Sequence, residues 1–168
     1  MGSIQPQVER LVVLNNTPLT NFALVQRPDL IFSLWSSAAC TTPAVLAEYE
    51  RGVSSGKLPV DLWGKLMVVA LTPQEIDFAN QLPLRLGEGE RTCLAVVRWR
   101  PGILVTDDLE ARRVARSYQI ALSGTLGILL ACLNGGWLTL PDGNHLLAQM
   151  IAAGFHSPLD LLDTYLSP

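Results

Sequence analysis

Acidic residues occur at positions where the sequence predicts that strands end and helices begin. Glu48 lies early in the predicted helix of the stretch TTPAVLAEYERG, and Glu90 lies in the first turn of the helix predicted in LGEGERTCLAVV. Asp107 and Asp108 directly follow the apolar run GILV. Acids that converge on one point repel each other and raise their pKa values unless a divalent cation neutralises them. Oxygen ligands favour a hard ion, so these residues predict a site for Mg²⁺ or Mn²⁺.

Asn15 and Thr106 occupy the positions directly after two predicted strands, LVVL and GILV. In an open parallel sheet, ligands bind beyond the carboxyl ends of the strands, at the point where the strand order reverses. If these two strands are neighbours, Asn15 and Asp108 face the same pocket.

Each acid also has a purely structural interpretation. Glu48 fits a solvated helix face, and Glu90 fits the first turn of a helix, where the helix dipole favours an acid. Asp107 or Asp108 fits a helix N-cap. The combination of these acids, rather than any one of them, favours a metal site.

Short apolar runs alternate with helical segments along the chain. Runs of this length between helices are typical of strands that are buried on both faces, as in a parallel sheet. The runs cover residues 11–14, 37–40, 66–71, 102–105 and 118–122. They predict an α/β fold, a three-layer α/β/α sandwich with a central parallel sheet of four or five strands.

A hydroxyl residue followed by proline marks several predicted helix starts, at Thr17, Thr42, Thr72 and Ser157. The hydroxyl can cap the first turn, and proline suits the first helical position because it has no amide hydrogen to leave unpaired. The predicted helices cover residues 17–25, 28–35, 43–51, 73–82, 88–98, 108–117, 125–133, 144–153 and 158–166. Residues 52–64 are predicted to form a long surface loop.

Composition and charge exclude several functional classes. The 168 residues, 49% of them apolar, suffice for one domain core, and the net charge of -3 argues against a broad phosphate-binding surface. Any nucleic-acid contact must then be local or bridged by a metal. The three cysteines lie in apolar contexts and the two histidines lack partners at ligand spacing, which argues against a zinc site and favours a reduced, cytoplasmic protein. The longest apolar stretch is interrupted too often to predict a membrane span, and no signal leader is recognisable.

Five stretches together resemble a PIN domain, specifically the compact prokaryotic subgroup of that family. They are LVVLNNTPL, TTPAVLAEYERG, LGEGERTCLAVV, the long run from GILVTDD to NGGWL, and the C-terminal AAGFHSPLDLLDTYL. The resemblance implies a single domain over residues 8–168, with residues 137–168 as a C-terminal helical extension. It also implies a metal-dependent ribonuclease site of the kind found in the toxins of bacterial toxin-antitoxin pairs.

The resemblance assigns roles to individual residues of this chain. The catalytic and metal-binding acids of the family fall on Glu48, Glu90 and Asp108, with Thr106 and Asp107 in support. The family has aspartate at the end of the first strand, where this chain has Asn15. An asparagine still offers its carbonyl oxygen to a cation, and its NH₂ group can hold a neighbouring carboxylate. It supplies no negative charge, however, so we expect a weakened site.

Partners of the protein are also implied. Arg112, Arg113 and Arg116 follow Asp108 on the next predicted helix and are candidates to contact RNA phosphates, with a solvated helix face as the alternative interpretation. The resemblance further implies an antitoxin-like protein and a second copy of the chain as partners. Trp35 and Tyr49 are candidates for the two-fold interface of such a homodimer.

Two functions fit these observations. The first is a Mg²⁺- or Mn²⁺-dependent ribonuclease that hydrolyses RNA phosphodiester bonds, with activity weakened by Asn15. The second is a catalytically inactive PIN-like module that binds RNA or a protein partner. Metal binding and RNA cleavage by the wild type and by an Asn15→Asp variant distinguish these two hypotheses.

Overall fold

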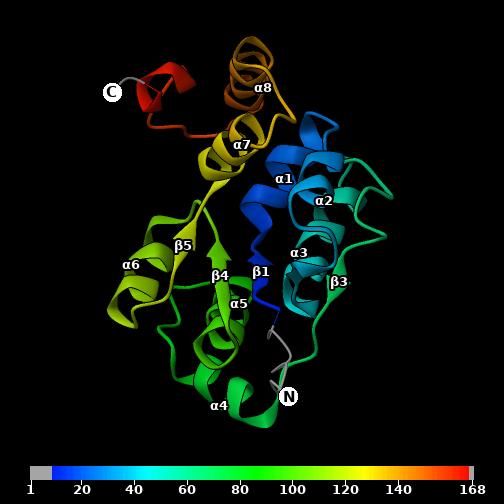
Figure 1. Ribbon diagram of the computed structural model, residues 1–168. Helices are drawn as coiled ribbons and strands as arrows, with labels where there is room; N and C mark the ends of the chain where they lie inside the picture. Colours follow the sequence, from blue (N-terminus) through cyan, green and yellow to red (C-terminus); the bar gives the residue numbers. More distant parts are fainter. Residues whose placement is uncertain (1–8, 167–168) are drawn as a thin grey trace, which may run out of the picture.

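Five parallel strands form a single sheet in the computed structural model, which describes residues 9–166 (Figure 1). The strands are β1 (Leu11–Leu14), β2 (Ala39–Thr41), β3 (Met67–Val68), β4 (Gly102–Val105) and β5 (Leu122–Ser123). Their order across the sheet is β3-β2-β1-β4-β5. The chain moves outward from β1 to β3 on one side and then crosses to β4 and β5 on the other, so the strand order reverses between β1 and β4. The predicted domain limits at residues 8 and 168 lie outside the described range.

Helices pack on the sheet and produce the predicted three-layer α/β/α sandwich (Figure 1). They are α1 (Asn16–Leu24), α2 (Asp29–Trp35), α3 (Pro43–Ser54), α4 (Pro73–Gln81), α5 (Glu88–Trp99), α6 (Leu109–Ser117), α7 (Thr125–Asn134) and α8 (Leu140–Ala152), with short 3₁₀ turns η1 (Ser36–Ala38) and η2 (Leu162–Tyr165). Helix α5 packs against β1 and β4 and contacts α3, α4 and α6. Helices α1, α7 and α8 pack against one another beyond the carboxyl ends of the strands.

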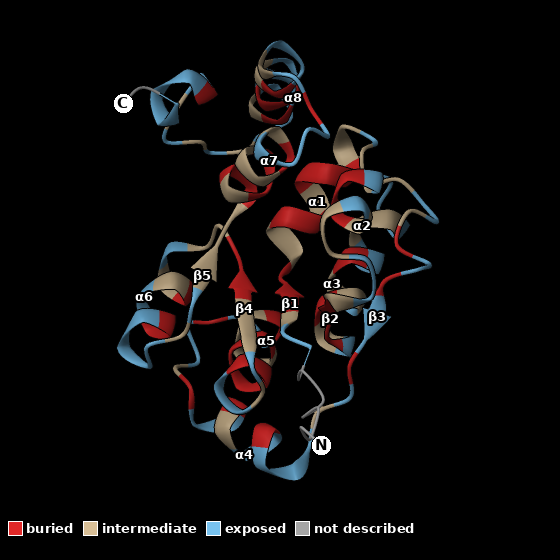
Figure 2. Ribbon diagram, viewed as in Figure 1, coloured by how far each residue is buried: buried red, intermediate tan, exposed pale blue. Residues whose placement is uncertain are grey.

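The core includes β1, β2, the end of β4 and α5 (Figure 2). Val13, Leu14 and Val105 are completely buried, as expected for strands with helices on both faces. The three cysteines are buried and free, which agrees with their prediction as reduced core residues. Among residues 9–166, none of the helices combines the length and the hydropathy that crossing a bilayer requires.

The threonine caps are confirmed at two of the predicted helix starts and wrong at a third. Thr42 accepts a hydrogen bond from an amide of the first turn of α3, and Thr72 forms a complete capping box at the start of α4. The predicted cap Thr17 lies instead inside α1, whose N-cap is Asn15. The Thr17 hydroxyl is used elsewhere, because it accepts a hydrogen bond from the amide of Asp107 at 3.1 Å.

The C-terminal helices also differ from the prediction. Helix α8 starts earlier than the predicted residue 144, because Thr139 accepts a hydrogen bond from an amide of its first turn. The helix predicted over 158–166 is wrong, since only the short turn η2 forms there. The Ser157 hydroxyl donates to the carbonyl of Leu159 at 2.6 Å and also accepts from the Leu159 amide, so it closes a local turn instead of capping a helix.

The outer strands are shorter than, or shifted from, the predicted runs. Residues 66–71 contribute only β3, although the Val69 amide still donates to the carbonyl of Thr41. Of the run predicted at 118–122, only Leu122 lies in β5, although the carbonyl of Ala121 also accepts from the Leu104 amide of β4. Gln119 has a positive φ of 56° and the Ile120 amide bonds back to α6, so most of this run forms the turn that ends α6. The strand predicted at 37–40 begins later, after η1.

Candidate functional site

The carboxyl ends of β1 and β4 bring Asn15 and Thr106 together. The two strands are neighbours in register, with Leu14 opposite Val105, so the residues that follow them lie side by side. The Asn15 amide nitrogen Nδ2 donates to the hydroxyl of Thr106 at 3.0 Å and to Oε1 of Glu90 at 3.3 Å. The sequence predicts this arrangement only if the two strands are neighbours, and the structure confirms that they are.

Glu48 and Glu90 converge at the start of α5. The amide of Gly89 donates to Oε1 of Glu48 at 3.1 Å, which holds the side chain from α3 against the first turn of α5. A Cβ atom on Gly87 would lie within 4 Å of both carboxylates, and one on Gly89 would lie 2.9 Å from the same Glu48 oxygen. A side chain at either position would therefore displace a carboxylate of this pair.

This pair of acids has no ion-pair partner among the described residues. Burial raises the pKa of Glu48, and the nearby Glu90 and Glu88 raise it further, whereas the Gly89 amide and Arg51 oppose the rise. Within residues 9–166, neither Glu48 nor Glu90 forms an ion pair with a lysine or arginine. The partial positive charge at the start of α5 offsets only part of this cost.

The carbonyl oxygen of the Asn15 side chain has no hydrogen-bond partner within the described chain, although Asn15 is completely buried. A buried acceptor left unpaired costs about 1–3 kcal/mol. The assignment of the two amide atoms is consistent with their surroundings, because exchanging them would place an oxygen against the Glu90 carboxylate. The orphaned oxygen is therefore free to accept from a water molecule or to bind a cation.

Asp108 lies next to this group but is held by its own helix. Its Oδ1 accepts a hydrogen bond from the amide of Ala111 at 2.6 Å, so it is the N-cap of α6, while its own amide donates to the Thr106 hydroxyl. Across residues 9–166, no group of three or more His, Cys, Asp or Glu side chains is assembled closely enough to hold a metal ion.

The donor types nevertheless fit a hard divalent cation. The carboxylates of Glu48 and Glu90 approach each other without a basic partner among the described residues. Asn15, which links Glu90 to Thr106 at the end of β4, adds an amide oxygen that has no hydrogen-bond partner within the described chain. All of these donors are oxygens, which Mg²⁺ and Mn²⁺ prefer.

Asp107 has a different environment from the other acids. Its two oxygens accept hydrogen bonds from the amide of Thr125 at 2.9 Å and from the Thr125 hydroxyl at 2.6 Å. Burial raises the pKa of Asp107, although these hydrogen bonds oppose the rise. The Thr125 hydroxyl also accepts from Asn21, so a buried polar chain connects β4, α7 and α1. Thr125 and Asn21 were missed by sequence reasoning, because only the fold brings them to Asp107.

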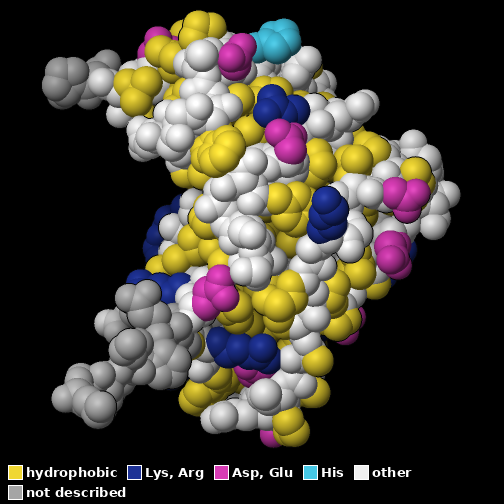
Figure 3. All heavy atoms as spheres, turned by 45° about the vertical axis from the view of Figure 1, so that its right-hand side comes forward, with side chains coloured by type: hydrophobic (Ala, Val, Ile, Leu, Met, Phe, Trp, Pro, Cys, Tyr) yellow, Lys and Arg dark blue, Asp and Glu magenta, His cyan; other side chains and the backbone are white. Residues whose placement is uncertain are grey.

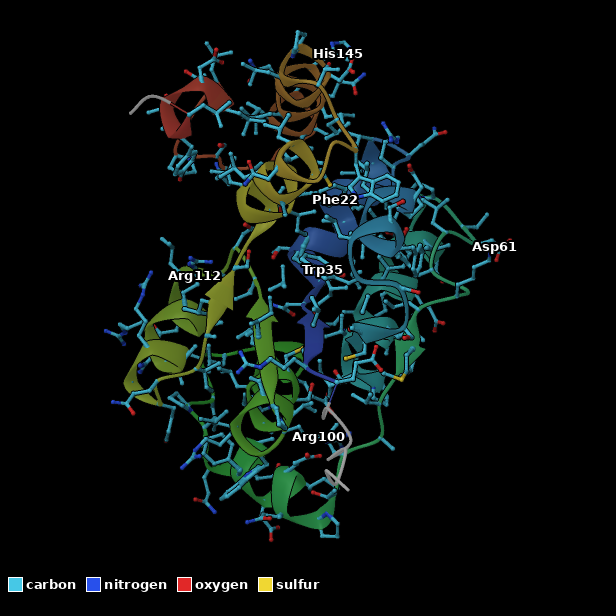
Figure 4. All side chains as sticks on the ribbon, viewed as in Figure 1. Phe22, Trp35, Asp61, Arg100, Arg112 and His145 are labelled. Atoms are coloured by element: carbon cyan, nitrogen blue, oxygen red, sulfur yellow. The ribbon has the colours of Figure 1, made fainter. Side chains whose placement is uncertain are left out.

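The three arginines of α6 are placed differently from one another. Nη1 of Arg112 donates to the carbonyls of Thr106 and Ser123 at 2.8 and 2.9 Å, so this side chain ties together the ends of β4 and β5 (Figure 4). Arg113 is exposed and pairs with Glu110 at 3.0 Å, and Arg116 is also exposed. Arg113 and Arg116 are therefore the two of the three that solvent can reach freely.

The predicted interface residue Tyr49 is not available to a second chain. Only 4% of its surface is exposed, and its hydroxyl donates to the carbonyl of Pro59 at 2.9 Å. Its ring also meets the Trp63 ring edge-on. Tyr49 therefore holds the loop after α3 within the same chain, and its prediction as an interface residue is wrong.

Comparison with known proteins agrees with this fold. Searches among curated proteins and among solved structures gave no match. A family model described as PIN domain matches residues 11–167, which is nearly the whole chain. This match includes the sheet, the converging acids and Asn15. The chain therefore belongs to the PIN-domain family.

Proposed function

We propose that this PIN-domain protein is a ribonuclease that hydrolyses RNA phosphodiester bonds with a bound Mg²⁺ or Mn²⁺ ion. The PIN domain is a nuclease fold, and PIN domains generally use divalent metal ions. The observation that carries the proposal is the convergence of Glu48 and Glu90 at the start of α5, without an ion-pair partner among the described residues. Acidic groups whose pKa values are perturbed by burial and by neighbouring charges cluster at functional sites.

Four residues would hold the ion: Glu48, Glu90, Asp108 and, through its orphaned oxygen, Asn15. When bound, such an ion supplies Lewis-acid stabilisation of the negative charge that builds up on the phosphate during hydrolysis. The chain prepares the donors beforehand. The Gly89 amide orients Glu48, the Asn15 amide nitrogen orients Glu90, and the Thr106 hydroxyl anchors both Asn15 and the backbone of Asp108.

RNA recognition by this protein would be local. On the face shown in Figure 3, Lys and Arg side chains are scattered among Asp and Glu side chains, and no broad basic patch covers this face of the described residues. Arg113 and Arg116 are exposed on α6, about one and two turns beyond Asp108, and would contact neighbouring phosphates. Arg112 already uses Nη1 to bind two backbone carbonyls, so it is the most constrained of the three arginines.

Partners beyond RNA belong to the same proposal. An antitoxin-like protein that covers the acids and a homodimer are both expected of a toxin of this type. With Tyr49 buried in its own chain, the partly exposed Trp35 on α2 is the remaining aromatic candidate for the two-fold interface. Light scattering at micromolar concentration tests the dimer, and a mass of only 18.3 kDa would contradict it.

Cleavage of a labelled single-stranded RNA in the presence of Mn²⁺ tests the activity. We expect slow cleavage by the wild type, no cleavage in EDTA, and at least about ten-fold less cleavage by Glu48→Gln, since even groups that only support a metal ligand contribute about that much. Glu50→Gln is the matched control, because Glu50 lies on the same helix but is exposed. Cleavage that survives in Glu48→Gln would contradict the proposed site.

The second candidate function is an inactive PIN-like module. It is favoured by one specific observation: the Asn15 amide nitrogen donates directly to Glu90, which satisfies part of this acid without any metal. In that case the wild type would not cleave RNA, and the Asn15→Asp variant would acquire Mn²⁺-dependent cleavage. The same assay therefore separates the two functions.

A further inference from the structure

An open groove of about 1230 Å³ lies beside the candidate site. Its walls are α1, the first turns of α6 and α7, the loop after α8, and η2. In Figure 1, α6 and the C-terminal segment lie on either side of the connection from β5 to α7. Asn16 and Asp108 line the groove, so it is continuous with the end of the sheet where the acids meet. A ligand in the groove would therefore reach the candidate site.

One wall of the groove is a fixed row of uncharged polar groups. Thr17, Thr20 and Asn21 share one face of α1 because they are three or four residues apart, and all three line the groove. The Thr17 hydroxyl accepts from the amide of Asp107, and the Asn21 side chain donates to Thr125. The first bond holds α1 against the segment after β4 and the second holds it against α7, so this wall is already in place before a ligand binds.

The opposite wall carries aromatic rings on an anchored segment. Phe155, His156 and Tyr165 line the groove there. The segment is fixed by Leu162, which is completely buried and whose amide donates to the Asn144 side chain at 2.8 Å. Tyr165 nevertheless remains 53% exposed. An exposed ring on an anchored turn offers a flat surface for stacking at little cost in conformational entropy.

The charges in the groove do not favour a phosphate. Arg112 is the one lysine or arginine among the lining residues of the described chain, and its Nη1 already bonds to two carbonyls. The acidic side chains among the lining residues of the described chain are Asp107 and Asp108. A flat, uncharged group with hydrogen-bonding edges fits these walls, as a nucleobase does.

We propose that the groove binds an unpaired nucleobase of the RNA strand, next to the phosphate at the acids, with the Tyr165 ring stacked on the base. The inference rests on the proposed function, because RNA is taken from it as the substrate. The groove then supplies sequence preference, since Thr20 and Asn21 present groups that can distinguish the edges of different bases.

Fluorescence anisotropy with labelled single-stranded RNA hexamers, each of one base, tests this proposal in EDTA, where cleavage does not interfere. We expect Tyr165→Ala to weaken binding at least about five-fold, as for the loss of one stacked base, and Tyr165→Phe to bind like the wild type. Trp137→Ala is the matched control, because Trp137 is exposed to almost the same extent, 52%, and does not line the groove. The Tyr165→Ala effect should be the same at about 50 mM and about 200 mM salt, because stacking releases no counterions.

The outcomes separate the inference from the proposed function. Equal binding by the wild type and Tyr165→Ala, or no binding of any hexamer, would overturn the groove as a base site. An effect of Tyr165→Ala that disappears at the higher salt would overturn stacking as its cause. If RNA binds through Tyr165 but is never cleaved with Mn²⁺, the groove assignment stands and the nuclease activity fails. Loss of affinity for a protein partner alone would instead identify the groove as a protein-binding surface.

Discussion

Helix α5 has a buried or half-buried glutamate packed near each of its ends, and the surroundings of these two acids are opposite. Near its C-terminal end, Arg100 donates to both oxygens of Glu75, at 2.7 and 2.8 Å (Figure 4). The side chain of Glu75 is only 2% exposed. Burial alone would raise the pKa of Glu75, but the hydrogen bonds from Arg100 and Thr72 outweigh burial and hold it below its ordinary value. At the N-terminal end, burial and the neighbouring acids raise the pKa of Glu48.

The difference lies in whether a buried acid is paired with a basic side chain. An unpaired buried charge costs several kcal/mol, and the chain avoids that cost at Glu75 with a two-bond ion pair. It provides no such pair for Glu48 and Glu90 among residues 9–166. The dipole of α5 favours an acid at one end and a guanidinium at the other, but contributes only about 0.3–1 kcal/mol. The acids at the N-terminal end therefore lack the ion pair that Glu75 has.

Removing the guanidinium group of Arg100 at the C-terminal end of α5 should have the largest effect on stability. Arg100→Met leaves Glu75 buried without its partner, and we expect the free energy of unfolding to fall by about 3 kcal/mol in urea titrations. Arg116→Met is the control, because Arg116 is exposed and forms no ion pair or cation–π contact among residues 9–166. A loss no larger than that of the control would show that the pair is not needed.

The same pair predicts a dependence of stability on pH. The pKa of Glu75 lies below its ordinary value of 4.5, so its contribution is fully present above that value and is lost as the pH falls through the lowered pKa. Arg100→Met should lose less stability than the wild type on acidification in this range. Parallel unfolding curves for the two proteins down to low pH would contradict this expectation.

Adding a carboxylate beside Glu90, at the N-terminal end of α5, should have the next largest effect on stability. Asn15→Asp removes the donor to Glu90 and Thr106 and places a third carboxylate at a completely buried position. We expect the metal-free protein to lose about 2 kcal/mol of stability. Added Mn²⁺ should restore this loss, which differential scanning fluorimetry would detect. An Asn15→Asp variant as stable in EDTA as the wild type would mean that the acids do not repel one another.

The smallest effect on stability is expected from loss of the Thr72 side chain, which caps the start of α4. Thr72→Ala removes the hydroxyl that accepts from the Glu75 amide at 3.3 Å, which should cost about 1 kcal/mol. Thr72→Ser should restore most of this stability in the same urea titrations. A cost as large as that of Arg100→Met would mean that the capping box, not the ion pair, secures this end.

Local patterns were enough to predict much of the fold and part of the site. The caps at Thr42 and Thr72 follow from the sequence around them, and the buried runs at 11–14 and 102–105 form strands with the predicted boundaries. The placement of Asn15 beside Thr106 followed from these strands once they were assumed to be neighbours. Such predictions succeed because each depends on a few consecutive residues and on one rule of sheet topology.

Contacts between distant segments were not predictable in the same way. Asp107 meets Thr125, and Arg112 spans the ends of β4 and β5, only because the folded sheet brings these groups together. The Ser157 pattern failed for the opposite reason, since its hydroxyl closes a local turn that competes with helix capping. Nothing in the local sequence distinguishes that serine from the threonines that do cap helices.

Titration calorimetry with Mn²⁺ tests most directly whether the N-terminal end of α5 is a cation site. We predict saturable binding of Mn²⁺ by the wild type, tighter binding by Asn15→Asp, and loss of binding in Glu48→Gln, with Glu50→Gln unchanged. Unaltered Mn²⁺ binding in Glu48→Gln, or no binding by either the wild type or Asn15→Asp, would contradict this account.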